Sequence, residues 1–488
     1  MLKRCMIAVV LVTLLSCVAA AQDAKTVISN ASRAMGADNL KSIEYSGSGM
    51  DFAIGQAPNP SSPWPKFIDK TYTRVINFET PASRMDRIRM QGENPPRGGG
   101  QQPVVGEQPQ NQTIIVNANT PWTQQLEIWM TPYGFLRAAA ANNATVKPET
   151  IRGKKYNVVT FVGQNKAKVN GYINEQNMVE RVETWLDNAM LGDMLFDASY
   201  SDYKDFGGLK FPTRIVQKQG DYPILDLTVT GVKPNAPANI QPPQGRGAAP
   251  AAAPAPAAAA QAAAPSEKLG DGVYLILGGY ASLAVDFKDY IVVVEGPQSE
   301  ERASAIIAEA KRLIPNKPIK YVVNTHAHFD HSSGLRTFVA EGATIITHQI
   351  NKPYFEKIFA LPHTLNPDKM AQSKKKPSFE TMTEKKVLTD GNHVIELHHM
   401  QRIGHHDGLL MVYLPKEKVL LEADAFNPPA QPITATPGTI SPYNTSLVEN
   451  IARLKLQVDR IIPVHYPADN RKVTMAELLK AAGKGSSE

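Results

Sequence analysis

The densest group of chemically capable side chains in this sequence lies between His326 and His331. The segment His326-Ala327-His328-Phe329-Asp330-His331 places three imidazoles and one carboxylate within six positions. All 11 histidines of the chain lie between His326 and His465, so the imidazole chemistry is confined to the later part of the sequence. Neutral imidazole nitrogens and carboxylate oxygens bind Zn(II), and Fe or Mn when carboxylates take part. The segment therefore predicts a metal site.

Three later positions have the right chemistry to complete such a site. His405 lies in the glycine-bounded turn Gly404-His405-His406-Asp407-Gly408, and His406 beside it is the alternative ligand. Asp424 follows the apolar run Val419-Leu420-Leu421-Glu422-Ala423, and His465 follows Ile461-Ile462-Pro463-Val464. Each position lies at the end of a predicted strand or in the adjoining loop, where α/β folds present functional groups. We expect these side chains to meet at one edge of a sheet.

The elements that must position these residues are short and alternate in type. Apolar runs predict strands at 273–277, 283–287, 290–294, 344–347, 394–397, 409–414 and 419–422, and another that ends at Asn324. Amphipathic patterns predict helices at 300–313 and 335–341. Strands that alternate with helices indicate an α/β domain, placed at residues 267–480. The stretch 351–384, rich in Pro, Lys and apolar residues, is expected to form a helical cap over the site.

The earlier part of the chain has a different pattern. A helical pattern opens it, and alternating runs predict strands at 43–52, 72–78, 157–162, 179–186 and 225–232. Residues 23–233 are therefore expected to form a mainly antiparallel β (α+β) domain with an accessory role and no catalytic group. A polar loop is expected at 91–112. The Pro/Ala-rich residues 234–266 have the composition of a linker between the two domains.

Residues 1–21 have the composition of a removable secretory signal. Lys3 and Arg4 precede an apolar stretch that is short for a membrane span, and the small residues Val18-Ala19-Ala20-Ala21 follow it. We expect an exported protein, periplasmic or secreted, with no stable membrane span. Lipid attachment at Cys17 is the minority alternative, because Leu14-Leu15-Ser16-Cys17 resembles a bacterial lipoprotein box.

Cysteine use and charge narrow the chemistry further. Cys5 and Cys17, the two cysteines, both lie in the leader, so a chain cut after Ala21 contains no thiol. Any metal must then be held by nitrogen and oxygen. The formal charge of +6 over 488 residues is weak support for a nucleic-acid partner. A small-molecule substrate is expected instead, and the sequence does not determine the oligomeric state.

The HxHxDH segment, followed in order by Gly404-His405, Asp424 and His465, resembles the metallo-β-lactamase fold superfamily over residues 268–470. The resemblance implies an αββα sandwich that holds two divalent metal ions, with Zn(II) favoured and Fe or Mn as alternatives. It also implies a ligand set: His326, His328 and His405 for one ion, Asp330, His331 and His465 for the other, with Asp424 bridging them.

The resemblance implies a binuclear hydrolase that uses a metal-bound hydroxide on an ester, thioester, lactone, amide or related bond. Asp330 is expected to orient the hydroxide or pass its proton to the leaving group. Tyr466 is a candidate donor to the developing oxyanion, with a buried structural tyrosine as the equal alternative. A true β-lactamase is the first alternative, although Asp424 stands where many antibiotic-degrading members place a cysteine. The second alternative is a binding module with a degenerate metal site.

Overall fold

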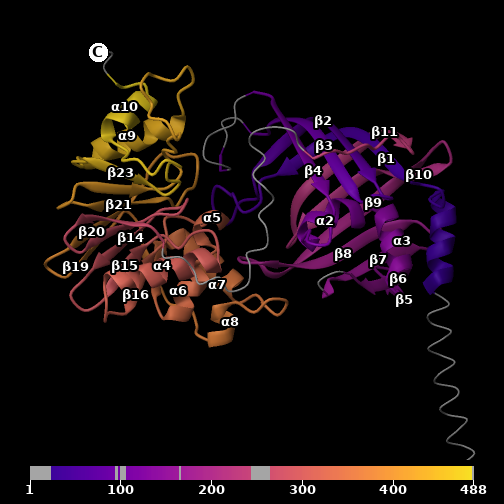
Figure 1. The fold of residues 1–488 in the computed structure, drawn as a ribbon, viewed down its shortest axis with the longest axis horizontal. Coiled ribbons are helices and arrows are strands. Elements are labelled where there is room, and N and C mark those ends of the chain that lie inside the picture. The colour runs from indigo at the N-terminus through magenta and orange to yellow at the C-terminus, as the bar shows by residue number, and fades with distance from the viewer. Residues whose placement is uncertain (1–23, 94–96, 99–105, 164–165, 243–263, 486–488) are drawn as a thin grey trace, which may run out of the picture.

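The computed structural model describes residues 24–93, 97–98, 106–163, 166–242 and 264–485 (Figure 1). The signal segment predicted at 1–21 and most of the linker predicted at 234–266 lie outside these residues. The architecture is mixed α/β, with an N-terminal antiparallel β domain and a C-terminal sandwich, as the sequence predicted. No helix among the described residues is long and apolar enough to cross a membrane.

The N-terminal domain is one curved sheet of eleven strands in the order β4-β3-β2-β1-β11-β10-β9-β8-β7-β6-β5. A helix at residues 24–35 precedes it. The strands are β1 (Ser42–Phe52), β2 (Lys66–Asn77), β3 (Ala82–Gln91), β4 (Gln108–Ile115), β5 (Thr145–Ile151), β6 (Lys154–Val162), β7 (Lys168–Asn174), β8 (Val179–Asn188), β9 (Gly192–Phe206), β10 (Leu209–Gln219) and β11 (Tyr222–Pro234).

Two helices, α2 (Trp122–Trp129) and α3 (Pro132–Ala141), pack against this sheet, and Figure 1 shows α2 on its concave side. Their apolar faces bury Leu126, Tyr133 and Phe135 in the sheet core. The Phe135 ring occupies the space where a Cβ at residue 171 in β7 would lie, so that position requires glycine. The two helices therefore contribute to the core of this sheet, together with the helix at residues 24–35.

The C-terminal domain contains two further sheets. The first has seven strands in sequence order: β12 (Ser266–Gly270), β13 (Val273–Ile276), β14 (Ser282–Asp286), β15 (Ile291–Val294), β16 (Ile319–Val323), β17 (Thr344–His348) and β18 (Phe379–Met382). The second has five: β19 (Lys385–Thr389), β20 (Val394–His399), β21 (Leu410–Leu414), β22 (Val419–Glu422) and β23 (Arg460–Pro463).

Helices cover the outer face of each of these sheets. Beside the first lie α4 (Glu300–Leu313), α6 (Leu335–Glu341), α7 (Lys352–Phe359) and α8 (Lys369–Ser373), and the short α5 (Phe329–Ser332) is part of the histidine loop at its edge. On the second lie α9 (Pro442–Leu454) and α10 (Met475–Ala481). In β15, Val292 and Val294 pack in the core between the sheets, whereas Ile291 and Val293 pack beneath the helices. Burial on both faces explains why this strand is wholly apolar.

Strand direction brings the predicted site residues to one edge. β16 pairs in parallel with β15 and β17, and it ends immediately before Asn324 and the histidine loop. In the second sheet β22 and β23 are parallel, so the residues that follow them, including Asp424 and His465, leave at the same end. Carboxyl ends of neighbouring parallel strands meet at one edge of a sheet. The two sheets pack face to face, and the site residues lie at this shared edge.

Two local expectations need correction. The loop expected at 91–112 is shorter, because residues 108–112 belong to β4 and pair with β3. These residues are polar because much of β4 is exposed, which hides the apolar alternation of a strand. The segment expected as a helical cap at 351–384 does contain α7 and α8, but its end forms β18, which extends the seven-stranded sheet beside β17.

Candidate metal centre

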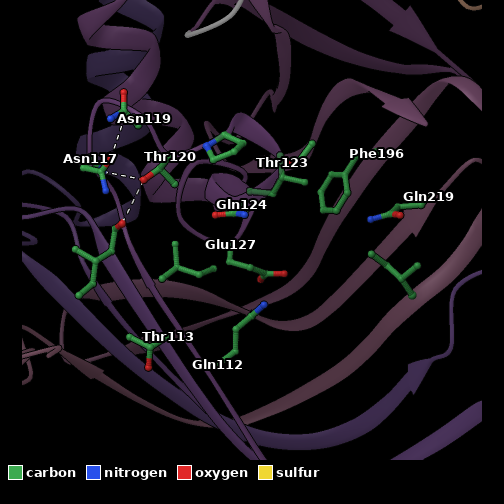
Figure 2. Close-up of a pocket in the computed structure, with 15 residues that line it drawn as sticks. Gln112, Thr113, Asn117, Asn119, Thr120, Thr123, Gln124, Glu127, Phe196 and Gln219 are labelled. Atoms are coloured by element: carbon green, nitrogen blue, oxygen red, sulfur yellow. Dashed lines mark hydrogen bonds between the residues drawn. The ribbon is translucent and has the colours of Figure 1, made fainter. Parts of the chain in front are cut away.

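A cavity of about 890 Å³ lies on the concave side of the N-terminal sheet, away from the histidines. Figure 2 shows Gln112 and Gln219 from the sheet and Gln124 and Glu127 from α2 around this space. Amide and hydroxyl groups dominate its lining, and it contains no histidine. Both groups of metal-ligand side chains found among the described residues lie in the C-terminal domain. The predicted metal site therefore lies in the C-terminal domain, at the edge where the strands of its two sheets end.

The first group consists of His326, His328, His405 and Asp424, all buried. The Nε2 atoms of His326 and His405 lie 3.2 Å apart. Asp424 Oδ2 lies 3.4 Å from His326 Nε2 and 3.3 Å from His405 Nε2. Ligands held about 2.0–2.1 Å from a tetrahedral ion lie about 3.3 Å from one another. These three atoms therefore have the mutual spacing of ligands to one ion.

The second group consists of Asp330, His331 and His465. The Nε2 atoms of the two imidazoles lie 3.3 Å apart. Asp330 Oδ2 lies 3.4 Å from His331 Nε2 and 3.5 Å from His465 Nε2. The same tetrahedral spacing recurs, and the side chains of Asp330 and His465 are 28% and 10% exposed. Solvent thus reaches the site on the side where Asp330 and His465 lie.

Asp424 lies between the two groups. Its Oδ1 is 2.9 Å from His465 Nε2, and its Oδ2 is 2.7 Å from His331 Nε2. The backbone of Asp424 has a positive φ of 61°, which is uncommon for a residue other than glycine. The turn is held by Glu422, whose Oε2 accepts hydrogen bonds from the backbone N–H groups of Ala425 and Phe426. Burial raises the pKa of Glu422 to about 8.

Hydrogen bonds from surrounding residues orient the histidine loop. His331 Nδ1 donates to Glu295 Oε2 at 2.8 Å, while Glu295 Oε1 accepts from the Thr325 backbone N–H at 2.8 Å. The side-chain amide of Asn324 donates to the backbone oxygens of His326 and His331. A carboxylate that accepts from one ring nitrogen leaves the other nitrogen free to bind metal. His331 Nε2 is therefore the atom that faces the site.

The charge states suit divalent cations. Burial lowers the pKa of His328 to about 3, so its imidazole is neutral. Burial opposes ionisation of Asp424, but the neighbouring imidazoles outweigh it and hold the pKa of this carboxyl well below its usual range. His328 Nδ1 is buried and has no hydrogen-bond partner among the described residues. The neutral imidazole of His328 with its unpaired Nδ1 and the ionised carboxylate of Asp424 are groups that bind divalent metal ions. Against the effect of burial, the neighbouring carboxylates raise the pKa values of His331 and His465, whose protons a bound ion would displace.

The structure brings together all seven predicted ligands but not Tyr466. The hydroxyl of Tyr466 accepts a hydrogen bond from Arg460 at 3.0 Å, and the side chain is 6% exposed. His406 also differs from His405, because its Nδ1 accepts from the Gly408 backbone N–H at 3.0 Å. The geometry thus places His405 in the first group and offers no support for Tyr466 as a proton donor.

Sequence reasoning missed three residues that contact the ligands. Tyr280 donates its hydroxyl to Asp330 Oδ2 at 3.0 Å, and its ring packs 4.4 Å from that of His465. Glu295 orients His331 as described above, and Gln56 of the N-terminal domain donates to Asp330 Oδ1 at 2.8 Å. The turn Gly278-Gly279-Tyr280 is a recognisable sequence signal, whereas Gln56 carries none.

Comparison with known proteins agrees with this architecture. A family model described as the metallo-beta-lactamase superfamily matches residues 285–465. No curated protein matches the chain significantly.

Several solved structures are similar to a little under half of the chain. A metallo-beta-lactamase from Pontibacter korlensis is 16% identical, with a TM-score of 0.33 over 45% of this chain and 98% of that one. A metallo-beta-lactamase from Hirschia baltica is 18% identical, with a TM-score of 0.34 over 46% of this chain and 98% of that one. A stereoselective inverting sec-alkylsulfatase from Pseudomonas sp. is 18% identical, with a TM-score of 0.32 over 45% of this chain and 40% of that one.

Proposed function

We propose that this chain is an exported, metal-dependent hydrolase of a small molecule, since a metallo-beta-lactamase superfamily model matches residues 285–465. The bonds that fit the proposal are those of esters, thioesters, lactones, amides and related groups. The observation that carries it is the pair of ligand groups, each with the spacing of ligands to one tetrahedral ion, joined through Asp424.

Two divalent ions, with Zn(II) favoured, fit these groups. His326, His328 and His405 would hold one, Asp330, His331 and His465 the other, and Asp424 both. When bound, such ions lower the pKa of a bound water towards about 7 and polarise the bond to be cleaved. The protein needs no serine or cysteine nucleophile for this chemistry.

Asp330 is the group that we assign to proton transfer. It is the most exposed carboxylate of the cluster, at 28% of its side chain, so a substrate can approach it. The Tyr280 hydroxyl donates to its Oδ2, and burial raises the pKa of Tyr280, which keeps that donor protonated. Asp330 is thereby fixed where it can accept a proton from the attacking water and return it to the leaving group.

Chelation is the direct test. The purified mature chain is assayed with lactone, thioester, phosphodiester, sulfate ester and β-lactam substrates, and its zinc content is measured by mass spectrometry. We expect two zinc ions per chain, loss of hydrolysis on chelation, and recovery on adding zinc. Hydrolysis that survives complete removal of metal would refute the proposal, and turnover of the β-lactam alone would make the chain a true β-lactamase.

Export has its own test. Cleavage after Ala21 would release a chain whose mass lacks residues 1–21, and we expect that mass for protein recovered from outside the cytoplasm. A full-length chain that stays in the cytoplasm would contradict export without affecting the proposed chemistry.

A further inference from the structure

We propose that the N-terminal domain is part of the metal centre, because residues 53–64, here called the roof segment, hold two of its ligands in their binding orientation. Gln56 and the backbone carbonyl of Ala57 are the positioning groups. The inference rests on the proposed function, since it assigns a role towards the metal ions.

The roof segment joins β1 to β2 but leaves the N-terminal sheet to lie on the C-terminal domain. The Gly55 carbonyl accepts from the Phe329 backbone N–H at 3.2 Å, and the Pro58 carbonyl accepts from the Asp407 backbone N–H at 2.7 Å. The ring of Trp64 meets that of Phe329 edge-on at 6.0 Å. The segment therefore touches both the HxHxDH loop and the turn that carries His405.

A second contact docks the two domains at a distance from the ligands. The carboxylate of Asp193, in β9, accepts from the backbone N–H groups of Thr364 and Leu365 at 2.8 and 2.9 Å. The backbone N–H of Asp193 donates in turn to the Pro362 carbonyl at 2.8 Å. Figure 1 shows α7, which precedes these residues, and α5 on the side of the C-terminal domain that faces the N-terminal sheet. Two separate contacts thus fix the roof segment over the site.

The contact to His328 selects the nitrogen that can bind metal. His328 Nε2 lies 2.8 Å from the backbone oxygen of Ala57. A carbonyl oxygen can only accept, so Nε2 carries the proton and Nδ1 has the free lone pair. Nδ1 is the buried atom with no partner among the described residues. The roof segment therefore presents His328 as an Nδ1 ligand.

The contact to Asp330 fixes the rotation of its carboxylate. Gln56 Nε2 donates to Oδ1 at 2.8 Å, which directs Oδ2 towards His331 and His465. Removal of a hydrogen bond of this kind to a metal ligand typically lowers metal affinity by about 10- to 100-fold. What is unusual is the source of the hydrogen bond, since Gln56 and Asp330 are separated by 274 positions in the chain.

The roof segment also closes one side of the site. Between it and His328, His406 and Tyr354 remains a cavity of about 20 Å³. Such a space holds about one water molecule, so a substrate cannot enter there. The partly exposed side chains of Asp330 and His465 mark where solvent still reaches the ligands. The N-terminal domain thereby limits the direction from which a substrate approaches.

Zinc affinity of full-length variants tests the inference. Gln56→Ala removes the donor to Asp330, and Gln219→Ala is the matched control, because it removes an amide that lines the N-terminal cavity far from the ligands. Affinity is measured by competition with a chromogenic chelator, and folding by circular dichroism. We expect Gln56→Ala to bind the weaker zinc ion about 10-fold less tightly, and Gln219→Ala to match the parent chain.

A kinetic readout separates positioning from general damage. If Gln56 acts on the metal centre, added zinc should restore the kcat of Gln56→Ala, whereas a damaged fold would not respond. Gln56→Glu should bind zinc less tightly than Gln56→Ala, because its carboxylate repels that of Asp330. Unchanged affinity in both variants would overturn the inference and leave the proposed function intact. A parent chain that binds no zinc would overturn both the inference and the proposed function.

Discussion

Both domains bury charged side chains, but they arrange them in opposite ways. In the N-terminal sheet Arg74 is 3% exposed and has its own partners: Glu127 at 3.2 Å, the Tyr72 hydroxyl at 2.7 Å and the Ser83 hydroxyl at 2.9 Å. In the C-terminal domain the ligand atoms of each group lie 3.2–3.5 Å from one another around a common centre. Paired charges indicate a structural role, whereas convergent lone pairs indicate a site for cations.

The largest expected effect comes from the carboxylate between the two ligand groups. Asp424→Asn keeps the shape of the side chain but removes its charge, so we expect loss of at least one ion and a fall in kcat/KM on the order of 10⁴-fold, or ~5 kcal/mol. Zinc content and hydrolysis measure it. Asp459→Asn is the control, because that exposed side chain lies away from the ligands. Two bound ions and normal turnover in Asp424→Asn would show that the convergent carboxylate is not needed for metal binding, which would contradict the contrast with the paired charges of the N-terminal sheet.

Breaking a paired charge should affect stability and not metal binding. Arg74→Met leaves Glu127 half-buried without its partner, and we expect a loss of about 3–4 kcal/mol in the free energy of unfolding. All four tryptophans, Trp64, Trp122, Trp129 and Trp185, lie in the N-terminal domain, so tryptophan fluorescence in urea reports this loss.

The matched control for Arg74 is Arg84→Met. Arg84 is 56% exposed and pairs with Asp86 on the same strand, so its removal should change stability by less than about 1 kcal/mol. Both variants should bind the same amount of zinc as the parent. A zinc deficit in well-folded Arg74→Met would show that the sheet charges serve the metal centre after all.

The roof segment brings the N-terminal domain into contact with the ligand residues, and the absence of a side chain at Gly55 allows it to lie close to the Phe329 ring. Gly55 has a φ of +69°, and a Cβ there would lie 2.2 Å from the Phe329 ring. Gly55→Ala should lift the roof segment from His328 and Asp330 and weaken zinc binding by about 10- to 100-fold, or ~1.4–2.7 kcal/mol. Gly153→Ala isolates the backbone strain, because Gly153 has a φ of +80° and a Cβ added there would meet no described atom within 4 Å. Equal zinc affinity in the two variants would mean that the close approach is not required.

The smallest effect concerns a buried carboxyl of the N-terminal sheet that is poorly paired. Asp69 is fully buried, and burial raises its pKa from 3.8 to about 6, with Arg87 opposing the shift. Its neutral form therefore stabilises the fold below about pH 4, and this contribution is lost as the pH rises through about 6. Asp69→Asn should remove about 2 kcal/mol of this pH dependence, measured by urea unfolding at about pH 4.5 and about pH 7.5. Parallel stability profiles for variant and parent would contradict the shifted pKa.

Much of the C-terminal fold follows from local patterns. The helix predicted at 300–313 coincides with α4, where Ser299 caps the N-terminus and Lys311 and Arg312 occupy the last turn. Most of the ligands were predictable because they follow apolar strands, whose ends converge at one edge of a parallel sheet, and His405 was predictable from its glycine-bounded turn. The family match over residues 285–465 confirms the predicted fold of this part of the chain.

What sequence reasoning missed depends on contacts between distant residues or on side-chain direction. Strand β4 resembles a loop in sequence because most of its residues are polar and none is buried, so the apolar alternation of a strand is absent. Tyr466 is adjacent to His465 in sequence, yet its hydroxyl contacts Arg460 and not the ligands, a direction that sequence adjacency does not reveal. Gln56 carries no motif, and only folding brings it to Asp330.

The roof segment acts largely through main-chain atoms, with the carbonyls of Gly55, Ala57 and Pro58 making three of its contacts. Such contacts survive most amino-acid replacements, so they leave little trace in the residues that evolution preserves. A duplicated or recombined gene that carries only the histidine-bearing half would encode every ligand and still lose this support. On this proposal the two domains form one functional unit, and the histidine-bearing half alone would bind zinc less tightly.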